Sequence, residues 1–281
     1  MIRWPLLLLC LASAVGPLCA AEPFEISARR IVGTPQTVTV EKDGKLVTET
    51  VVVTVAVEST RKIDPAKTAL VICDMWDDHW CKAAAERCGK LANEAAPVIE
   101  AARKAGFTII HCPSDTMGYY AKSQARQRAK DVKKTEPPKP KVIEAPALPI
   151  DDSDGGCDDA TPVKSFKAWT RQHEAIVVDE ARDFVTDDGR EVYNIVRDRG
   201  IATVVVMGVH TNMCVLNRSF AIKQLRKWDI DCLLVRDLTD AMYNPKKKPF
   251  VTHAAGTQLV IGHIEQYWCP SIAAKDLAGK K

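Results

Sequence analysis

The sequence predicts an α/β fold in which a mainly parallel β-sheet lies between two layers of helices. Short runs rich in Val and Ile alternate along the chain with longer stretches of helical spacing. Such runs are typical of strands buried on both faces of a parallel sheet, and the helices between them supply the crossover connections. A pair of β-rich runs near the N-terminus predicts a β-hairpin that extends this three-layer α-β-α domain.

The N-terminal extension is predicted from residues 31–58. Its two β-rich runs flank Asp43-Gly44, a dipeptide typical of two-residue hairpin turns, and Asp64-Pro65 then marks a boundary. We therefore assign residues 21–66 to a β-hairpin extension and residues 67–275 to the main domain. The hairpin is expected either to cover a sheet edge or to mediate contact between subunits.

The main domain is expected to begin with a strand over residues 68–74 that ends at Asp74. A helix over 91–105 stops at Gly106, a residue typical of helix C-termini, and a strand over 107–111 follows. A later helix is capped by Asp187 or Asp188 and stops at Gly200. The remaining expected elements are strands at 175–178, 203–207 and 232–235, helices at 213–225 and 251–267, and a short edge element at 269–272.

Residues 119–165 are expected to form an insertion that is first basic and Pro-rich and then acidic. Lys and Arg at helical spacing, followed by Pro137-Pro138 and Pro140, predict a surface helix that runs into an extended linker. The acidic stretch 151–159 lacks the spacing of an EF-hand loop, so we expect a solvated loop, either salt-bridged to the basic segment or pinned by Cys157.

The overall charge gives no indication of a nucleic-acid partner. Lys and Arg number 39 against 36 Asp and Glu, and 38 against 36 without Arg3. The basic stretch also lacks interleaved aromatic residues. A small-molecule substrate is the expected partner, with a homo-oligomer as a further possibility.

Residues 1–20 predict a secretory signal peptide. Arg3 supplies the positive region, Leu6–Val15 the apolar core, and Leu18-Cys19-Ala20 a cleavage site. No later run is long and apolar enough to span a bilayer. We therefore expect an exported protein, periplasmic or extracellular, with no membrane span once the signal is removed.

Export would permit disulfides. Of 10 cysteines, Cys10 and Cys19 lie in the signal. Cys81 lies in a loop-like region and is expected to pair with Cys157 or with Cys88, and the sequence leaves both alternatives open. Three others, Cys73, Cys112 and Cys232, lie in or beside apolar strands and are expected in the core. There is no CxxC motif that would indicate a thioredoxin-type or zinc-ribbon site.

The strongest chemical signal lies at residues 203–215, TVVVMGVHTNMCV. A buried strand ends at Gly208, Thr211 and Asn212 are good helix N-caps, and Cys214 follows in the first turn of the expected helix. A helix N-terminus favours a thiolate, and the backbone N–H groups of Met213 and Cys214 would be placed to hold an oxyanion.

This stretch resembles the isochorismatase-like cysteine hydrolases, a family that includes nicotinamidases. Gly208–Val215 fits the family signature G-V-x-T-N-x-C-V, and Asp74-Met75-Trp76-Asp77-Asp78 is similar to its D-x-Q-x-D motif. The resemblance covers about residues 67–275. It implies an isochorismatase-like fold, Cys214 as nucleophile, Asp74 as general base and a non-proline cis peptide at Val209–His210.

Two family features are not matched. The family's catalytic Lys falls near Glu180 or Ala181, so Arg182, the nearest cation, is the candidate for its role, with Lys82, Lys164 and Lys167 as others that could fold inward. The family's D-x-H metal pair corresponds here to Asp115 and Met117, so no metal and no cofactor are expected. Expected pocket residues are Trp76 and Trp80, which either stack on a planar ligand or wall the core, together with His210, Thr211 and Asn212.

The resemblance and the motif together predict an exported hydrolase that cleaves a C–N, amide-type bond of a small molecule through Cys214. Hydrolysis of a vinyl ether is a weaker option because it does not need the thiol. The alternative is a catalytically impaired, ligand-binding member of the same fold, since the family's Lys is not matched.

Overall fold

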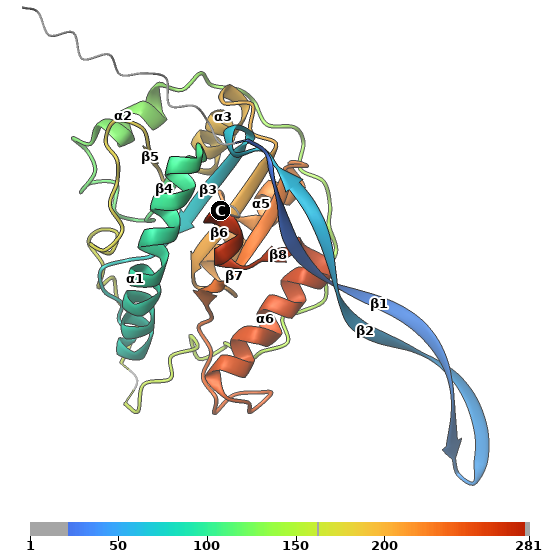
Figure 1. Cartoon of the computed structure of the whole chain (residues 1–281). Coiled ribbons are helices and arrows are strands. Elements are labelled where there is room, and N and C mark those ends of the chain that lie inside the picture. The colour runs from blue at the N-terminus through green and yellow to red at the C-terminus, as the bar shows by residue number, and fades with distance from the viewer. Residues whose placement is uncertain (1–21, 162, 279–281) are drawn as a thin grey trace, which may run out of the picture.

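The strands form one eight-stranded sheet in the order β2-β1-β8-β7-β6-β3-β4-β5 (Figure 1). The computed structural model describes residues 22–161 and 163–278, so the predicted signal peptide lies outside the described residues. The strands are β1 (Phe24–Lys42), β2 (Lys45–Ile63), β3 (Thr68–Cys73), β4 (Thr108–Cys112), β5 (Phe184–Val185), β6 (Thr203–Val209), β7 (Asp231–Asp240) and β8 (Ser271–Ile272). Strands β3 to β8 pair in parallel, which confirms the predicted mainly parallel sheet.

Helices cover both faces of the sheet, as predicted. They are α1 (Lys82–Ala105), α2 (Gln124–Asp131), α3 (Gly189–Asp198), α4 (Cys214–Asn217), α5 (Ile222–Lys227) and α6 (His253–Tyr267), with 3-10 turns η1 (Pro65–Lys67) and η2 (Ala274–Ala278). Alternate residues of β3 enter opposite cores: Leu70 and Ile72 pack on the side of α1, and Val71 packs on the side of α3, α5 and α6. Because successive strand side chains point to opposite faces, a fully buried strand must be apolar throughout.

The β-hairpin forms as predicted and continues the sheet beyond β8. Asp43 and Gly44 both have positive φ, 52° and 70°, which is the backbone of a two-residue turn that matches the strand twist. At its base, Ile26 and Ala28 are buried in the α1-side core, and Arg29 pairs with Ser271 of β8. The hairpin therefore covers a sheet edge, and its far part projects from the body (Figure 1). The segment at 269–272 was wrongly expected at the edge, because β8 lies between β7 and β1.

The expected strand over 175–178 is wrong. Of this run only Ile176 is buried, and Val177 is 71% exposed. The sheet is extended instead by β5, which pairs with β4. A buried polar network fixes the chain before β5: Asp183 accepts hydrogen bonds from Arg103 and contacts His111 at 3.0 Å. These long-range side-chain contacts outweigh the local strand preference of Val and Ile.

The expected helix over 213–225 is also wrong, because it is broken into α4 and α5. Ser219 lies in the break, and its hydroxyl accepts the N–H of Gly189 at the start of α3. A Cβ at Gly189 would lie 2.0 Å from the Ser219 carbonyl oxygen, so the two segments are in close contact. Tertiary packing thus ends α4 after one turn.

The helix expected in the basic segment forms as α2. Ser123 caps α2, and the chain beyond it has no regular secondary structure through the Pro-rich linker. Within residues 22–161 and 163–278, no helix combines the length and apolar character needed to cross a membrane.

Candidate active site

Asp74 lies at the carboxyl end of β3, fully buried. Its φ of 47° turns the chain sharply out of the strand. The carboxylate accepts the Ser114 N–H at 2.7 Å and the Arg218 Nε–H at 2.9 Å. Each oxygen of a buried carboxylate therefore has a donor, as a buried charge requires.

Cys214 is brought to the same edge by β6, the parallel neighbour of β3. Cys73 is paired with Gly208, and a Cβ on Gly208 would lie 2.0 Å from the Cys73 carbonyl oxygen. Only glycine permits this approach, because it has no Cβ. Its φ of 115° is also a conformation that other residues rarely adopt. The peptide bond between Val209 and His210 is cis, as the family resemblance implied, and Cys214 follows as the first residue of α4.

Arg218 supplies the cation of this site, and the sequence analysis did not identify it. It follows Cys214 by one helical turn, and its side chain is 33% exposed. The guanidinium bridges Asp74 and the exposed Asp115, whose carboxylate lies 3.4 Å away. Burial lowers the pKa of Arg218, but the adjacent Asp74 carboxylate outweighs it and raises the pKa above its ordinary value.

The predicted catalytic Arg182 is not brought to Cys214. Its side chain is exposed and paired with Asp179 at 2.7 Å. The other cations considered are also engaged elsewhere or exposed: Lys82 pairs with Asp78, and Lys167 bonds the Asp115 carbonyl oxygen. The sequence does carry a signal for Arg218: it lies four residues after Cys214, a spacing that places two side chains on the same side of a helix.

The surroundings of Cys214 raise the pKa of its thiol. Burial and then the Asp74 charge raise its pKa to about 12, although Arg218 and a backbone hydrogen bond with His210 partly oppose them. Burial also raises the pKa of Asp74, against the charge of Arg218 and a hydrogen bond with Cys214. The sequence predicted that a helix N-terminus would favour a thiolate at Cys214. The helix α4 does begin at Cys214, but it is a single turn and contributes little dipole.

The two predicted oxyanion donors differ in availability. The Met213 N–H donates to the His210 carbonyl oxygen at 3.0 Å, so it is already satisfied. No hydrogen bond within the described part of the chain uses the Cys214 N–H. The Cys214 amide is thus the remaining donor next to the thiol.

Thr211 and Asn212 hold the nucleophile turn in place rather than capping α4. The Thr211 hydroxyl bonds the Thr239 hydroxyl at 2.7 Å. The Asn212 side chain donates to the Met242 carbonyl oxygen and accepts the Met242 N–H at 2.8 Å. Both side chains therefore tie the turn to the chain at and beyond the end of β7.

The thiol opens into a cleft of about 420 Å³. Its lining is mixed and charged: Leu148, Asp152, Asn212, Met213, Cys214, Asn217, Arg218 and Lys223. A second hollow of about 530 Å³ shares Asn217 and Arg218 with it and adds Ser114, Asp115, Asp187, Asp188 and Ser219. Of the five predicted pocket residues, only Asn212 lines the cleft at Cys214.

The predicted aromatic residues form a packed cluster instead. Trp76 is 5% exposed, and its ring stacks on Trp169 with centroids 4.1 Å apart. His210 packs edge-on against His79, and burial lowers the pKa of His210 to about 3, so it is neutral at physiological pH. Trp80 is half-buried beside the disulfide. Trp169, from the loop that follows the insertion, was not anticipated.

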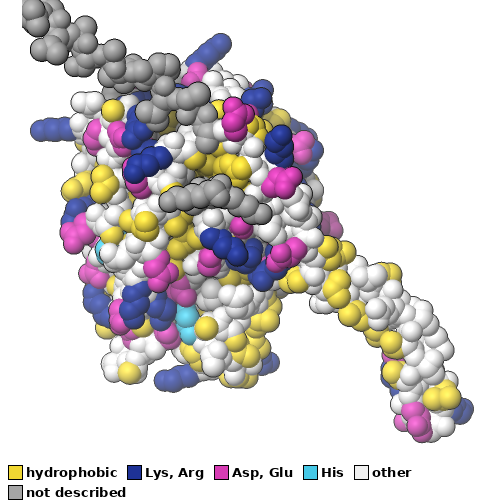
Figure 2. Space-filling model, viewed as in Figure 1, with side chains coloured by type: hydrophobic (Ala, Val, Ile, Leu, Met, Phe, Trp, Pro, Cys, Tyr) yellow, Lys and Arg dark blue, Asp and Glu magenta, His cyan; other side chains and the backbone are white. Residues whose placement is uncertain are grey.

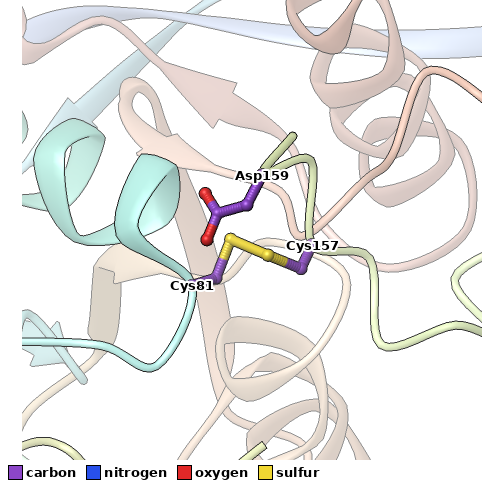
Figure 3. A group of neighbouring side chains, drawn as sticks. All are labelled: Cys81, Cys157 and Asp159. Atoms are coloured by element: carbon purple, nitrogen blue, oxygen red, sulfur yellow. A yellow bond between two sulfur atoms is a disulfide. The ribbon is translucent and has the colours of Figure 1, made fainter. Parts of the chain in front are cut away.

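The disulfide joins Cys81 to Cys157, one of the two pairings left open, with Cα atoms 5.7 Å apart. Cys88 is free and buried, as are the predicted core cysteines Cys73, Cys112 and Cys232. Asp159 lies beside both sulfur atoms (Figure 3), but sulfurs joined in a disulfide are not thiolate ligands for a metal.

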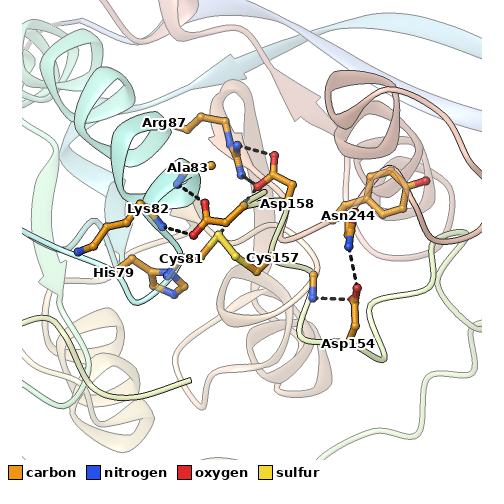
Figure 4. Close-up of a disulfide and its surroundings, with 12 residues drawn as sticks. His79, Cys81, Lys82, Ala83, Arg87, Asp154, Cys157, Asp158 and Asn244 are labelled. Atoms are coloured by element: carbon orange, nitrogen blue, oxygen red, sulfur yellow. Dashed lines mark hydrogen bonds and ion pairs between the residues drawn. A yellow bond between two sulfur atoms is a disulfide. The ribbon is translucent and has the colours of Figure 1, made fainter. Parts of the chain in front are cut away.

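The acidic loop docks on the start of α1 through this disulfide. Asp159 accepts the N–H groups of Lys82 and Ala83 at 2.9 and 2.8 Å, and Asp158 pairs with Arg87 (Figure 4). Free N–H groups at a helix start favour such a carboxylate. The acidic loop is therefore pinned by Cys157, as one of the sequence interpretations held.

The comparisons with known proteins define the class. The isochorismatase domain model matches residues 68–262, and the chain therefore belongs to that family. It is an isochorismatase-family hydrolase with an isochorismatase-like fold. No curated protein matches it significantly.

Several solved structures resemble this chain at low identity. A cysteine hydrolase from Pseudomonas syringae pv. phaseolicola 1448A is 16% identical with a TM-score of 0.49, over 77% of this chain and 92% of that one. An isochorismatase from Pseudomonas putida KT2440 is 13% identical with a TM-score of 0.45, over 76% and 91%. An isochorismatase family protein from Burkholderia thailandensis is 14% identical with a TM-score of 0.42, over 76% and 94%.

Proposed function

We propose that this protein hydrolyses a C–N, amide-type bond of a small molecule, with Cys214 as nucleophile, Asp74 as general base and Arg218 as the cation that holds the pair. The observation that carries the proposal is the contact of one buried carboxylate with both the thiol and the guanidinium. A nucleophile beside a base that a third group orients is the arrangement of covalent hydrolases.

The reaction begins with proton transfer from the Cys214 sulfur to the Asp74 carboxylate. The transfer moves the negative charge from oxygen to sulfur, and Arg218 interacts with the charge in both positions. The cluster keeps its net charge, so Arg218 offsets part of the penalty of making a thiolate in a buried site.

The thiolate then attacks the carbonyl carbon, and the Cys214 N–H donates to the oxygen that becomes negative. The amine leaves with the proton from Asp74, which returns to the carboxylate form. Water next attacks the thioester while Asp74 accepts its proton, and the released thiolate recovers that proton. A mixed charged cleft of about 420 Å³ suits a small polar substrate.

Turnover of a panel of small amides tests this proposal, with Cys214→Ala as the variant. The wild-type protein is expected to hydrolyse at least one amide, and Cys214→Ala to lose the activity by a factor of about 10³ or more. Turnover of a vinyl ether that survives Cys214→Ala would contradict the thiol mechanism.

The second candidate, a ligand-binding protein without turnover, is favoured by the raised pKa of Cys214. It predicts that a ligand found by thermal shift stabilises the wild-type protein and Cys214→Ala equally, and that neither variant consumes it. Comparison of the wild-type protein with Cys214→Ala therefore distinguishes the hydrolase from the ligand-binding protein.

We also propose that the protein is exported. The Cys81–Cys157 disulfide supports this, since such bonds persist in oxidising compartments. Expression of the whole chain followed by N-terminal sequencing of the exported protein tests it. A mature N-terminus at Ala21 is expected, and a chain retained in the cell with Met1 would contradict it.

A further inference from the structure

The cleft beside Cys214 contains two side chains of opposite charge that the proposed reaction does not use. They are Lys223 of α5 and Asp152 of the acidic loop, and both line the cleft. The third charged residue in the lining is Arg218, whose guanidinium already contacts the carboxylates of Asp74 and Asp115. The charges of Lys223 and Asp152 are therefore the ones left to interact with a ligand.

Lys223 is half-buried and lacks a counter-charge. Its Nζ donates to the Asn217 Oδ1 at 2.8 Å and lies 5.3 Å from the centroid of the Trp268 ring, and both of these partners are neutral. Lys223 forms no ion pair with any residue that the structure describes. Burial, together with the nearby Lys227, lowers the pKa of the Lys223 ammonium. A ligand carboxylate would offset the cost of keeping this charge in a half-buried site.

Asp152 is also half-buried, and its charge is likewise uncompensated. Its carboxylate accepts a hydrogen bond from the Asn212 side-chain amide at 2.7 Å, and it pairs with no cation in the described part of the chain. The loop that carries Asp152 is fixed to α1 by the Cys81–Cys157 disulfide. Asp152 is thus held at the wall of the cleft by contacts that do not involve its own charge.

These two charges differ from the ordinary charges of the protein surface. Lys and Arg side chains are interspersed with Asp and Glu side chains on the face of the body shown in Figure 2. Water and salt screen such exposed charges, so they need no partner. Lys223 and Asp152 instead share one cleft of about 420 Å³ and still do not pair with each other. Two opposite charges held apart in one cleft are complementary to a ligand that carries both charges.

The hydrogen-bond partners of the two charges flank the nucleophile. Asn212, which bonds Asp152, precedes Cys214, and Asn217, which bonds Lys223, ends the single turn of α4 that begins at Cys214. A ligand that contacts both charges would therefore lie across the thiol.

We propose that the substrate of this site is a small zwitterionic amide, whose carboxylate pairs with Lys223 and whose ammonium group pairs with Asp152. This inference rests on the proposed hydrolysis at Cys214, because it names the class of amide that is cleaved. Lys223 and Asp152 take no part in breaking the C–N bond. They determine specificity by binding the two charged groups of the substrate.

Turnover of L-glutamine and of three analogues that keep its primary amide tests the proposal. The analogue 4-aminobutanamide lacks the carboxylate, 4-carbamoylbutanoic acid lacks the ammonium group, and butanamide lacks both. The zwitterion is expected to have a kcat/KM about 10-fold or more above that of either singly charged analogue, because each loses one charged contact. Glycylglycine, with glycine N-methylamide and N-acetylglycine as its singly charged analogues, covers substrates whose charges lie on either side of the amide.

Variants assign each preference to one residue. Lys223→Gln should reduce the preference for the zwitterion over the analogue without a carboxylate, and Asp152→Asn the preference over the analogue without an ammonium group. The Asn side chain keeps an acceptor oxygen for Asn212. Lys227→Gln and Asp151→Asn are the matched controls, since they remove the same charges outside the cleft lining, and they should keep both preferences. Damage to folding lowers activity on all the substrates together and leaves these ratios unchanged.

Binding of the same compounds to Cys214→Ala, measured by calorimetry, separates this inference from the proposed function. If the zwitterion binds Cys214→Ala more tightly than its analogues but the wild-type protein cleaves no amide, the proposed hydrolysis fails and the ligand class stands. If the wild-type protein cleaves amides without preferring a zwitterion, the inference is overturned and the hydrolysis stands. A preference that survives in both Lys223→Gln and Asp152→Asn overturns the inference as well, as does the absence of any preference in both cleavage and binding.

Discussion

Replacement of Arg218 by Gln tests the assignment that the sequence alone did not make. The substitution removes the positive charge beside Asp74 and keeps a polar side chain in the cleft. In the structure, the Arg218 Nε–H donates to a fully buried carboxylate at 2.9 Å. Arg218 lowers the pKa of both Asp74 and Cys214.

The size of the effect follows from the type of contact. A hydrogen bond to a charged group contributes about 1.5–3 kcal/mol. The Arg218 side chain is 33% exposed, and solvent screening reduces its contribution, so we take about 2 kcal/mol. At 1.36 kcal/mol per tenfold change, kcat/KM should fall by about 30-fold at neutral pH.

The pH profile gives the reasoning a second test. Asp74 must be ionised to accept the thiol proton, so activity rises with pH through its pKa. Because Arg218 holds that pKa down, its removal should move the acidic limb of kcat/KM to higher pH. Arg218→Lys keeps the charge and should move the limb less.

The assay is kcat/KM between about pH 5 and about pH 10 on an amide that the wild-type protein cleaves. Arg182→Gln is the matched control, because Arg182 is an exposed Arg paired only with Asp179. The reasoning is refuted if Arg218→Gln stays within about twofold of wild type, or if Arg182→Gln loses as much activity as Arg218→Gln.

Three further predictions concern the same framework. Asp74→Asn should abolish turnover yet raise Tm at neutral pH. The pKa of Asp74 is raised in the folded protein, so ionisation of its carboxyl destabilises the fold as pH rises through that pKa. A fall in Tm would instead show that the ion pair with Arg218 stabilises the fold by more than burial of the charge destabilises it. Cys81→Ala combined with Cys157→Ala should lower the free energy of unfolding by about 2–4 kcal/mol, since the bond closes a loop with a separation of 76 residues, and reductant should destabilise the wild-type protein but not this variant. Gly208→Ala should destabilise by about 3 kcal/mol or more in denaturant titrations, because its Cβ would lie 2.0 Å from the Cys73 carbonyl oxygen at a φ of 115°, and an unchanged midpoint would contradict this.

The sheet could be predicted from sequence because its strands are buried on both faces. The run Thr203–Met207 is apolar and rich in Val, as a strand buried on both faces requires, and the carboxyl ends of neighbouring parallel strands meet at one edge. Together with the resemblance to the isochorismatase-like family, this position at the strand ends predicted that Asp74 and Cys214 share one site.

Arg218 could not be found in that way, because the expected cation was sought after a strand over 175–178 that does not form. The chain there is held by side-chain contacts far apart in sequence, among them Asp183 with Arg103 and His111. The break after α4 arises similarly, from the packing of Ser219 against Gly189. Periodicity describes one element at a time and carries no information about such contacts.

The central claim is that Cys214 forms a covalent intermediate with help from Asp74. The most direct measurement is brief reaction of the native protein with p-nitrophenyl acetate, followed by mass mapping of the acylated residue. The account predicts an acyl group on Cys214, much slower acylation in Asp74→Asn, and no modification of the buried Cys73, Cys88, Cys112, Cys232 and Cys269. An acyl group on another residue, or p-nitrophenol release by Cys214→Ala at the wild-type rate, would contradict it.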